Sequence, residues 1–208
     1  MADRPILLVA GLGRCGTTMM MTMLDAGGFP VTGPRPSYEL SDQWHLGRPD
    51  PTWIAVQGGK AVKWLDPTKF RAGMRNLLPA EPVIFLMERD PREQARSQVK
   101  LLAGLVGPDR HIVKAMERSI RRDTPLVRAQ MRALGTVYSF KFEDVLKSPV
   151  IVASQLRGIV DRHFGTLFDP AVAARAVIPR HPSCAPDFWM ENVVLPEIAK
   201  ELEMRDAA

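Results

Sequence analysis

The sequence predicts an α/β fold, with a mostly parallel central sheet flanked by helices. Two short, continuous apolar runs at positions 5–10 and 83–88 have the composition of strands that are buried on both faces, as in parallel sheets. Each run is followed by a helical pattern, and this alternation is typical of α/β proteins. With 208 residues, of which 46% are hydrophobic, the chain has the size of one domain spanning 1–208.

The first strand leads into a helix. The run PILLVA at 5–10 is followed by glycine, and TTMMMTMLDA at 17–26 is rich in helix formers. Gly27 and Gly28 come directly after this segment and indicate its C-terminal end. The residues from 11 to 16 therefore join a strand to a helix N-terminus.

The elements that follow are less regular. A second short strand is expected at 29–32, and the many prolines after it predict an irregular segment at 33–52. A weak strand is expected at 60–64, before the clear apolar strand VIFLME at 83–88. A helix should open at Pro91, because proline is tolerated in the first turn.

The second half of the chain is predicted to be mainly helical. The pattern from 91 to about 134 is interrupted near 104–109 and at Thr124-Pro125, which predicts two or three helices. A last strand is expected at 137–140. Two further helices are expected, from Ser148-Pro149 to about 164 and near 192–203, with a proline-rich stretch at 179–186 between them.

Charge and cysteine usage restrict the ligands and the compartment. The net charge of +5 favours anionic ligands, including nucleotides, sulfate esters and nucleic acids. Cys15 and Cys184 match no metal or redox spacing, which indicates a reducing compartment. The apolar run at 5–10 is too short for a signal peptide or a membrane span, so we expect a cytoplasmic protein.

The loop from Gly11 to Thr18 (GLGRCGTT) has the frame in which backbone N–H groups surround a phosphate at a helix N-terminus. Loops of this frame bind several classes of ligand, of which two are considered first: nucleoside triphosphates and dinucleotides. A kinase or ATPase needs lysine before the final hydroxyl residue, where this chain has Thr17. The overlapping G-x-G-x-x-G also fits a dinucleotide. The segment 29–32 does not end in the acidic residue that would bind the ribose of NAD, but Arg35 could bind the 2′-phosphate of NADP, so NADP stays an alternative.

The thiol of Cys15 lies in this loop, where a helix N-terminus can lower the pKa of a cysteine and make it a nucleophile. A cysteine-phosphatase loop requires an arginine six residues further on, where this chain has Met21. The sequence therefore favours a binding role over nucleophilic catalysis for Cys15.

A second phosphate-directed pattern follows the strand at 83–88. Arg89 leaves the strand edge and begins an R-x-P (Arg89-Asp90-Pro91), and Ser97 lies eight residues after Arg89 on the helix. A guanidinium and a hydroxyl at this spacing can reach one phosphate.

These two patterns together resemble those of the sulfotransferase family. The residues RCGTT at 14–18 resemble its 5′-phosphosulfate loop, with Cys15 where the family commonly has serine, and the strand, R-x-P and later serine resemble its 3′-phosphate motif. The segment at 140–149 is similar to the strand and E-D-L-x-x-x-P segment that the family carries after its central helices.

The resemblance implies a donor and its binding residues. It implies 3′-phosphoadenosine 5′-phosphosulfate (PAPS) as sulfuryl donor and adenosine 3′,5′-bisphosphate (PAP) as product. Arg89 and Ser97 would bind the 3′-phosphate, and Arg180 would partly substitute for a C-terminal basic loop. The 5′ end would be bound by the loop residues Gly11, Gly13, Arg14, Cys15, Gly16, Thr17 and Thr18.

The resemblance also suggests catalytic residues for metal-independent, in-line sulfuryl transfer to a hydroxyl or amine. Arg14 and the loop amides would stabilise charge on the leaving oxygen. Glu39 is the first candidate for the base that takes the acceptor proton, and His45 is the second. Lys63, which precedes Pro67 in a segment similar to the family's K-x-P, would approach the sulfuryl group.

Two other functions stay open at this point: an NADP-dependent reductase, and a noncatalytic nucleotide- or nucleic-acid-binding module. The basic stretch around Arg121-Arg122 lacks the interleaved aromatic residues of a nucleic-acid face, so no nucleic-acid partner is expected. The expected partners are a nucleotide sulfuryl donor and an acceptor substrate. The sequence names neither the acceptor nor the oligomeric state.

Overall fold

The computed structural model describes residues 4–39, 51–70, 75–106 and 110–178 and has a parallel four-stranded sheet at its centre. The strands are hydrogen-bonded in the order β2-β1-β3-β4, and each neighbouring pair is parallel. They span β1 (Leu7–Gly11), β2 (Ala61–Leu65), β3 (Val83–Glu88) and β4 (Thr136–Lys141). The predicted α/β class with a mostly parallel sheet is confirmed.

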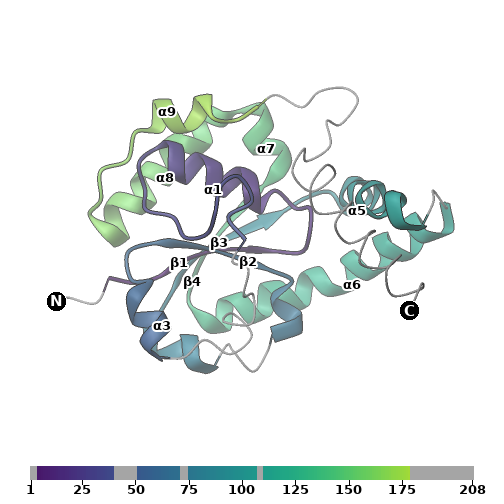
Figure 1. The fold of residues 1–208 in the computed structure, drawn as a ribbon, viewed down its shortest axis with the longest axis horizontal. Helices are drawn as coiled ribbons and strands as arrows, with labels where there is room; N and C mark the ends of the chain where they lie inside the picture. Colours follow the sequence, from purple (N-terminus) through teal and green to yellow (C-terminus); the bar gives the residue numbers. More distant parts are fainter. Residues whose placement is uncertain (1–3, 40–50, 71–74, 107–109, 179–208) are drawn as a thin grey trace, which may run out of the picture.

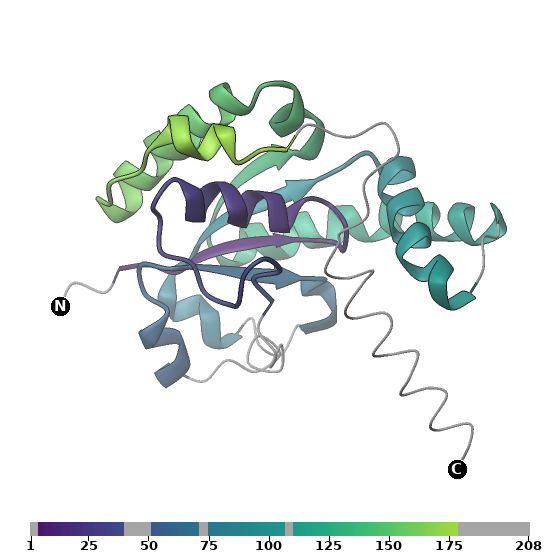
Figure 2. The ribbon, with the colours of Figure 1, turned by 45° about the horizontal axis from the view of Figure 1, so that its top comes forward.

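Helices cover both faces of the sheet (Figure 1). The α-helices are α1 (Thr17–Ala26), α3 (Pro51–Val56), α5 (Pro91–Val106), α6 (Arg110–Leu134), α7 (Phe142–Lys147), α8 (Pro149–Phe164) and α9 (Pro170–Arg175). Short 3₁₀ turns lie at η1 (Pro67–Phe70) and η2 (Leu78–Ala80). Helices α1, α8 and α9 lie over one face, and α3 and the C-terminal half of α6 lie over the other; Figure 2 shows the same layers from a second angle.

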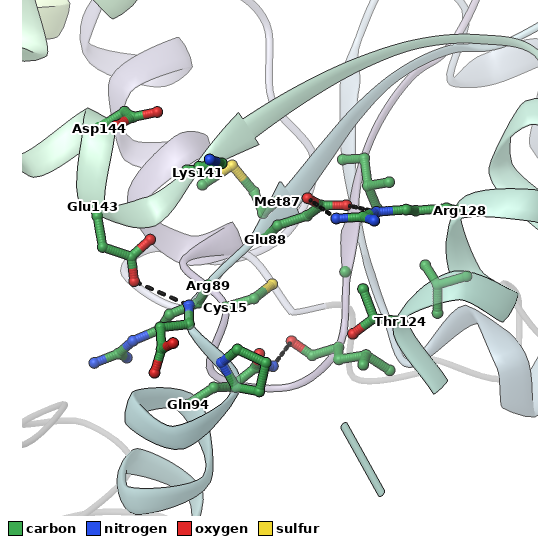
Figure 3. Close-up of a pocket in the computed structure, with 16 residues that line it drawn as sticks. Cys15, Met87, Glu88, Arg89, Gln94, Thr124, Arg128, Lys141, Glu143 and Asp144 are labelled. Atoms are coloured by element: carbon green, nitrogen blue, oxygen red, sulfur yellow. Dashed lines mark hydrogen bonds and ion pairs between the residues drawn. The ribbon is translucent and has the colours of Figure 1, made fainter. Parts of the chain in front are cut away.

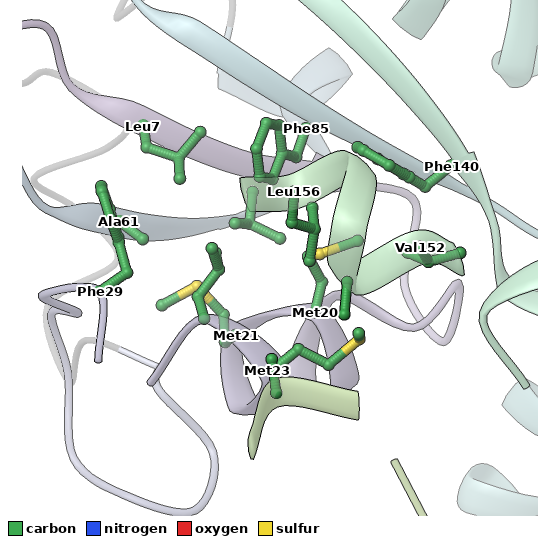
Figure 4. Packing of buried hydrophobic residues seen from close by; sticks show 14 of the residues in the cluster. Leu7, Met20, Met21, Met23, Phe29, Ala61, Phe85, Phe140, Val152 and Leu156 are labelled. Carbon is green, nitrogen blue, oxygen red and sulfur yellow. The ribbon is translucent and has the colours of Figure 1, made fainter. Parts of the chain in front are cut away.

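One core layer lies between the sheet and helices α1, α8 and α9. Because successive side chains of a strand point to opposite faces, Leu7 and Val9 of β1 face this layer together with Phe85 of β3. Methionines of α1 and aliphatic residues of α8 pack against them (Figure 4). All five residues of β1 are buried, which explains why this strand reads as a continuous apolar run.

The second core layer lies under α6 and α3. The alternate strand residues Leu8, Val62 and Ile84 face it, and Met131 and Leu134 of α6 pack on them. None of the helices in the described parts of the chain is long and apolar enough to cross a bilayer.

Several predicted elements are confirmed with small shifts. Helix α1 has the predicted bounds, the weak strand at 60–64 is β2, and the last strand at 137–140 is β4. Helix α8 begins at Pro149, and the interruption near 104–109 corresponds to the end of α5 at Val106 and the start of α6 at Arg110.

Other expectations are wrong. The segment 29–32 makes only an isolated bridge between Val31 and Ala61, and helix α3 begins inside the segment that was expected to be irregular. Helix α6 continues through Pro125, because apolar residues on both sides of the proline, Ile120 and Val127, are buried. Their packing offsets the backbone hydrogen bond that proline cannot donate. The proline-rich stretch 179–186 and the expected helix 192–203 lie outside the described residues.

Candidate functional site

The glycine-rich loop between β1 and α1 lies at the carboxyl edge of the sheet, where α/β proteins commonly bind ligands. Gly16, which precedes α1, has φ of 103°, and a Cβ there would lie 2.6 Å from a ring carbon of Phe142. At Gly11 a Cβ would lie 2.3 Å from the Cys15 sulfur. Both positions therefore require glycine, which accounts for two of the three glycines in the loop.

Three side chains from outside the loop hold the peptide groups of Gly13. Its N–H donates to Asp66 Oδ1 at 3.0 Å, just beyond β2. Its carbonyl accepts from Gln94 Nε2 at 2.8 Å and from Gln98 Nε2 at 2.7 Å, both on α5. Sequence reasoning missed these three residues. Their only sequence signal is position: Asp66 follows a strand, and the glutamines are one helical turn apart after another strand.

Arg14, Arg89 and Ser97 come together on the α5 side of the loop. Arg14 Nε donates to Ser97 Oγ at 3.1 Å, and Arg89 donates through one terminal nitrogen to the Arg14 carbonyl at 3.2 Å. The Arg89 guanidinium also lies 4.4 Å from the centre of the Phe142 ring. Two patterns separated by more than 70 positions in sequence thus meet at one loop residue.

Lys63 forms a second cluster on the β2 side of the loop. Its ammonium donates to Thr18 Oγ1 and to Glu39 Oε1, both at 2.8 Å, and to the Ser37 carbonyl at 2.9 Å. These three acceptors match its three N–H donors. The Lys63 side chain is 2% exposed and that of Glu39 is 28% exposed, so Glu39 has one side toward solvent.

The segment that carries Glu39 is attached to the end of α1 through Asp25. Tyr38 donates to Asp25 Oδ2 at 2.8 Å, and Arg35 forms an ion pair with the same carboxylate. Burial opposes ionisation of Asp25, but hydrogen bonds from Arg35 and Tyr38 outweigh it and hold its pKa below the ordinary value of 3.8. These contacts restrain the chain immediately before Glu39.

The thiol of Cys15 is buried in the core layer beneath the loop and is 1% exposed. Burial is the main cause that raises its pKa to about 12. A cysteine with this pKa is a protonated thiol at neutral pH, whereas a nucleophilic cysteine reacts as the thiolate. The N–H of Cys15 donates to the Leu12 carbonyl at 3.2 Å, so this residue shapes the loop from within.

A cavity of about 490 Å³ opens beside the loop (Figure 3). Its wall includes Cys15, the ends of β3 and β4, and the first turns of α5 and α7. Glu88 at its edge is paired with Arg128 of α6, with 2.7 Å between Oε2 and the guanidinium, and Glu143 Oε1 accepts from the Asp90 N–H at 3.1 Å. The cavity lies at the ends of β1 and β3. The strand order reverses direction between these two strands, and this position is typical of nucleotide pockets in α/β folds.

The other predicted residues fall into two groups. Thr17 is buried, with 3% exposure, at the start of α1 next to Thr18. His45 and Arg180 lie outside the described residues. Within the described ranges, no cluster of three or more His, Cys, Asp or Glu side chains could hold a metal ion.

Basic residues that supported the competing functions have acidic partners. Arg35, the candidate for an NADP phosphate, is paired with Asp25. Arg121 and Arg122 on α6 are paired with Glu117 and Asp123. These pairs reduce the positive charge that either region offers to a phosphate.

Comparisons with known proteins find similarity only among solved structures. The sulfotransferase from Alicyclobacillus acidocaldarius has 16% sequence identity and a TM-score of 0.48, over 94% of this chain and 95% of that one. Mouse sulfotransferase SULT7A1, in complex with PAP, has 13% identity and a TM-score of 0.49, over 85% of this chain and 63% of that one. No family model and no curated protein matches the sequence.

Proposed function

We propose that this protein is a sulfotransferase that moves a sulfuryl group from PAPS to a hydroxyl or amine acceptor. The observation that carries the proposal is the meeting of both phosphate-directed patterns at Arg14, which contacts Ser97 through its side chain and Arg89 through its carbonyl. A nucleotide with phosphates at the 3′ and the 5′ positions of its ribose requires two groups of phosphate-binding residues that lie close together.

The 5′ end of the donor would lie against the loop amides and the N-terminus of α1. Backbone N–H groups at a helix N-terminus favour phosphate, and the hydroxyls of Thr17 and Thr18 would add to them. Lys63, at 2.8 Å from Thr18 Oγ1, would place a positive charge beside the transferring group. A fixed donor aimed at developing charge typically lowers a barrier by about 3 kcal/mol.

Glu39 is the base in this proposal. The acceptor oxygen or nitrogen would attack sulfur while the bond from sulfur to the bridging phosphate oxygen breaks, and that bond's electrons would stay on PAP. The acceptor proton would pass to Glu39, whose carboxylate is partly exposed and is bound at Oε1 by Lys63. The ammonium of Lys63 would stabilise the leaving oxygen.

A ligand panel tests this function directly. PAP, NADP and ATP with Mg²⁺ are each added to the full chain and the melting temperature is measured, because a ligand that binds only the folded form stabilises it by about 2.7 kcal/mol at a concentration about 100 times its Kd. PAP should raise the melting temperature most. A larger shift with NADP would overturn the proposal in favour of a reductase.

A matched pair of variants and a turnover assay complete the test. Arg89→Ala should reduce the PAP shift, because the 3′-phosphate loses its guanidinium, whereas Arg92→Ala, an exposed arginine on α5, should retain the full shift. Wild-type protein should also transfer labelled sulfuryl from PAPS to at least one member of a panel of alcohols, phenols, amines and sugars. PAP binding without transfer to any of them would instead indicate a noncatalytic nucleotide-binding module.

A further inference from the structure

The carbonyl of Gly13 joins the glycine-rich loop to α5 through two glutamine side chains. Gln94 Nε2 donates to this carbonyl at 2.8 Å and to the neighbouring Leu12 carbonyl at 3.2 Å (Figure 3). Gln98 Nε2 donates to the Gly13 carbonyl at 2.7 Å. Gln94 is buried, with 3% exposure, and its two contacts use both N–H donors of its amide. The loop and the first half of α5 are therefore fixed to each other.

Ser97, which the proposed function assigns to the 3′-phosphate, lies on the face of α5 that contacts the loop. Side chains three positions apart on a helix are neighbours, and Ser97 follows Gln94 by three positions. Its Oγ accepts from Arg14 Nε at 3.1 Å. A shift of α5 relative to the loop would thus move Ser97 relative to the N-terminus of α1, where the 5′ end of the donor is proposed to bind.

The opposite side of the loop is bound to β2 and not to α5. Asp66, directly after β2, accepts from the Gly13 N–H at 3.0 Å and donates its own N–H to the Gly11 carbonyl at 3.0 Å. Lys63 of β2 donates to Thr18 Oγ1 at 2.8 Å. The loop therefore keeps these contacts with the sheet when the glutamine amides are removed.

The spacing between the loop and α5 matters because one ribose carries both phosphates of PAP. A single molecule occupies both groups of binding residues only when these lie at the distance that the ribose sets. Binding at one phosphate then presents the other at a high effective concentration, and this gain is lost where the geometry does not fit. Sites held at the right spacing before the ligand arrives gain further affinity, because less ordering is needed on binding.

We propose that Gln94 and Gln98 are positioning residues, which set the distance between the 5′- and the 3′-phosphate sites by binding the Gly13 carbonyl. They determine how much affinity a nucleotide gains from carrying both phosphates, and they act through the loop and α5 rather than by contact with the ligand. This inference rests on the proposed function, which assigns the two phosphates to these two elements.

Three ligands test this role: PAP, adenosine 5′-monophosphate and adenosine 3′-monophosphate. Their dissociation constants are measured by calorimetry, at one salt concentration, for wild type and for the double variant Gln94→Met/Gln98→Met, which keeps side chains of similar length and removes both amides. The variant should bind PAP roughly tenfold more weakly, because the hydrogen bonds that fix the spacing are lost. The affinity for each monophosphate should change less than about threefold, because each needs only one of the two sites.

Two further variants separate this role from a general loss of stability. Gln130→Met removes the same amide from a half-buried glutamine of α6 and should leave all three affinities unchanged. Gln98→Met alone keeps the buried Gln94 and should show a smaller loss, again for PAP alone, which covers the case in which the double variant fails to fold. Partial unfolding weakens every ligand by the same factor, so the ratio of two affinities does not depend on it.

The outcomes distinguish this inference from the proposed function. If wild type prefers PAP, but the glutamine variants lose as much affinity for either monophosphate as for PAP, the glutamines only stabilise one site and this inference alone is wrong. Unchanged affinities for all three ligands would equally overturn it. If wild type binds PAP no more tightly than the monophosphates, the proposed function fails and this inference fails with it.

Discussion

Lys63 connects the glycine-rich loop between β1 and α1 to the segment that carries Glu39. Its ammonium is nearly fully buried and has an oxygen acceptor for each of its three N–H donors. A buried cation held in this way is a fixed positive charge, which is the property that charge stabilisation in a transition state requires.

Replacing Lys63 with methionine keeps the apolar stem and removes the charge. We expect Lys63→Met to lower kcat for sulfuryl transfer by about 10²–10³-fold, the typical loss for one preorganised donor. Lys60→Met, three residues earlier at the start of the same strand region, is the control and should retain activity. Equal rates for the two variants in a steady-state assay would exclude a catalytic role for Lys63.

Cys15 gives a prediction about chemical reactivity. Because the thiol is buried and its pKa is raised to about 12, it should react with iodoacetamide far more slowly in the native protein than in urea, at pH 7 and at pH 8. The measurement uses a Cys184→Ser background, so that Cys15 is the only thiol. Rapid native labelling at pH 7 would show instead that this cysteine is an accessible thiolate.

At the scale of the elements, the turn from β1 to α1 depends on Gly16. Gly16→Ala should lower the free energy of unfolding by at least about 1–2 kcal/mol, from the left-handed conformation alone, and further because of the contact with Phe142. Urea unfolding measures the change.

Alanine substitutions at two other glycines distinguish the cost of the left-handed conformation from the cost of the contact with Phe142. Gly28→Ala has a positive φ but open space around its Cβ, so it should show the conformational cost alone. Gly158→Ala lies inside α8 with no neighbour within 4 Å and should stabilise the protein by up to about 1 kcal/mol. If Gly16→Ala costs no more than Gly28→Ala, the contact with Phe142 is unimportant.

The segment 33–39 is restrained by Asp25, and this contact depends on pH. The pKa of Asp25 in the folded protein is below its ordinary value of 3.8, so its stabilising contribution is present above pH 3.8 and is lost as the pH falls through the lower folded value. Asp25→Asn should therefore make the unfolding midpoint less sensitive to pH between 4 and 2. If the unfolding midpoint of Asp25→Asn depends on pH in the same way as that of the wild type, this pH dependence does not come from Asp25.

For the whole molecule, the strand and loop patterns predicted the parallel sheet and the position of the glycine-rich loop at its edge. Continuous apolar runs identify β1 and β3 because both strands are buried on both faces, and the residues RCGTT indicate the loop by local composition. Arg89 and Ser97 could be predicted because they lie on one strand and the helix that follows it.

The remaining features depend on contacts that a local pattern does not encode. The pairing of Lys63 with Glu39 joins β2 to a loop 24 positions earlier, and the contacts of Gly13 come from two different elements. Helix α6 continues through Pro125 because of packing on the sheet, which local propensity cannot anticipate. Tertiary packing therefore decided the features that sequence reasoning missed.

Binding of one nucleotide through two phosphates is tested by titration calorimetry of wild type and Arg89→Ala with PAP and adenosine 5′-monophosphate. Wild type should bind PAP about 10–100-fold more tightly than the monophosphate, and Arg89→Ala should lose this preference while still binding the monophosphate. Equal wild-type affinities for the two ligands, or a preference that survives in Arg89→Ala, would contradict it.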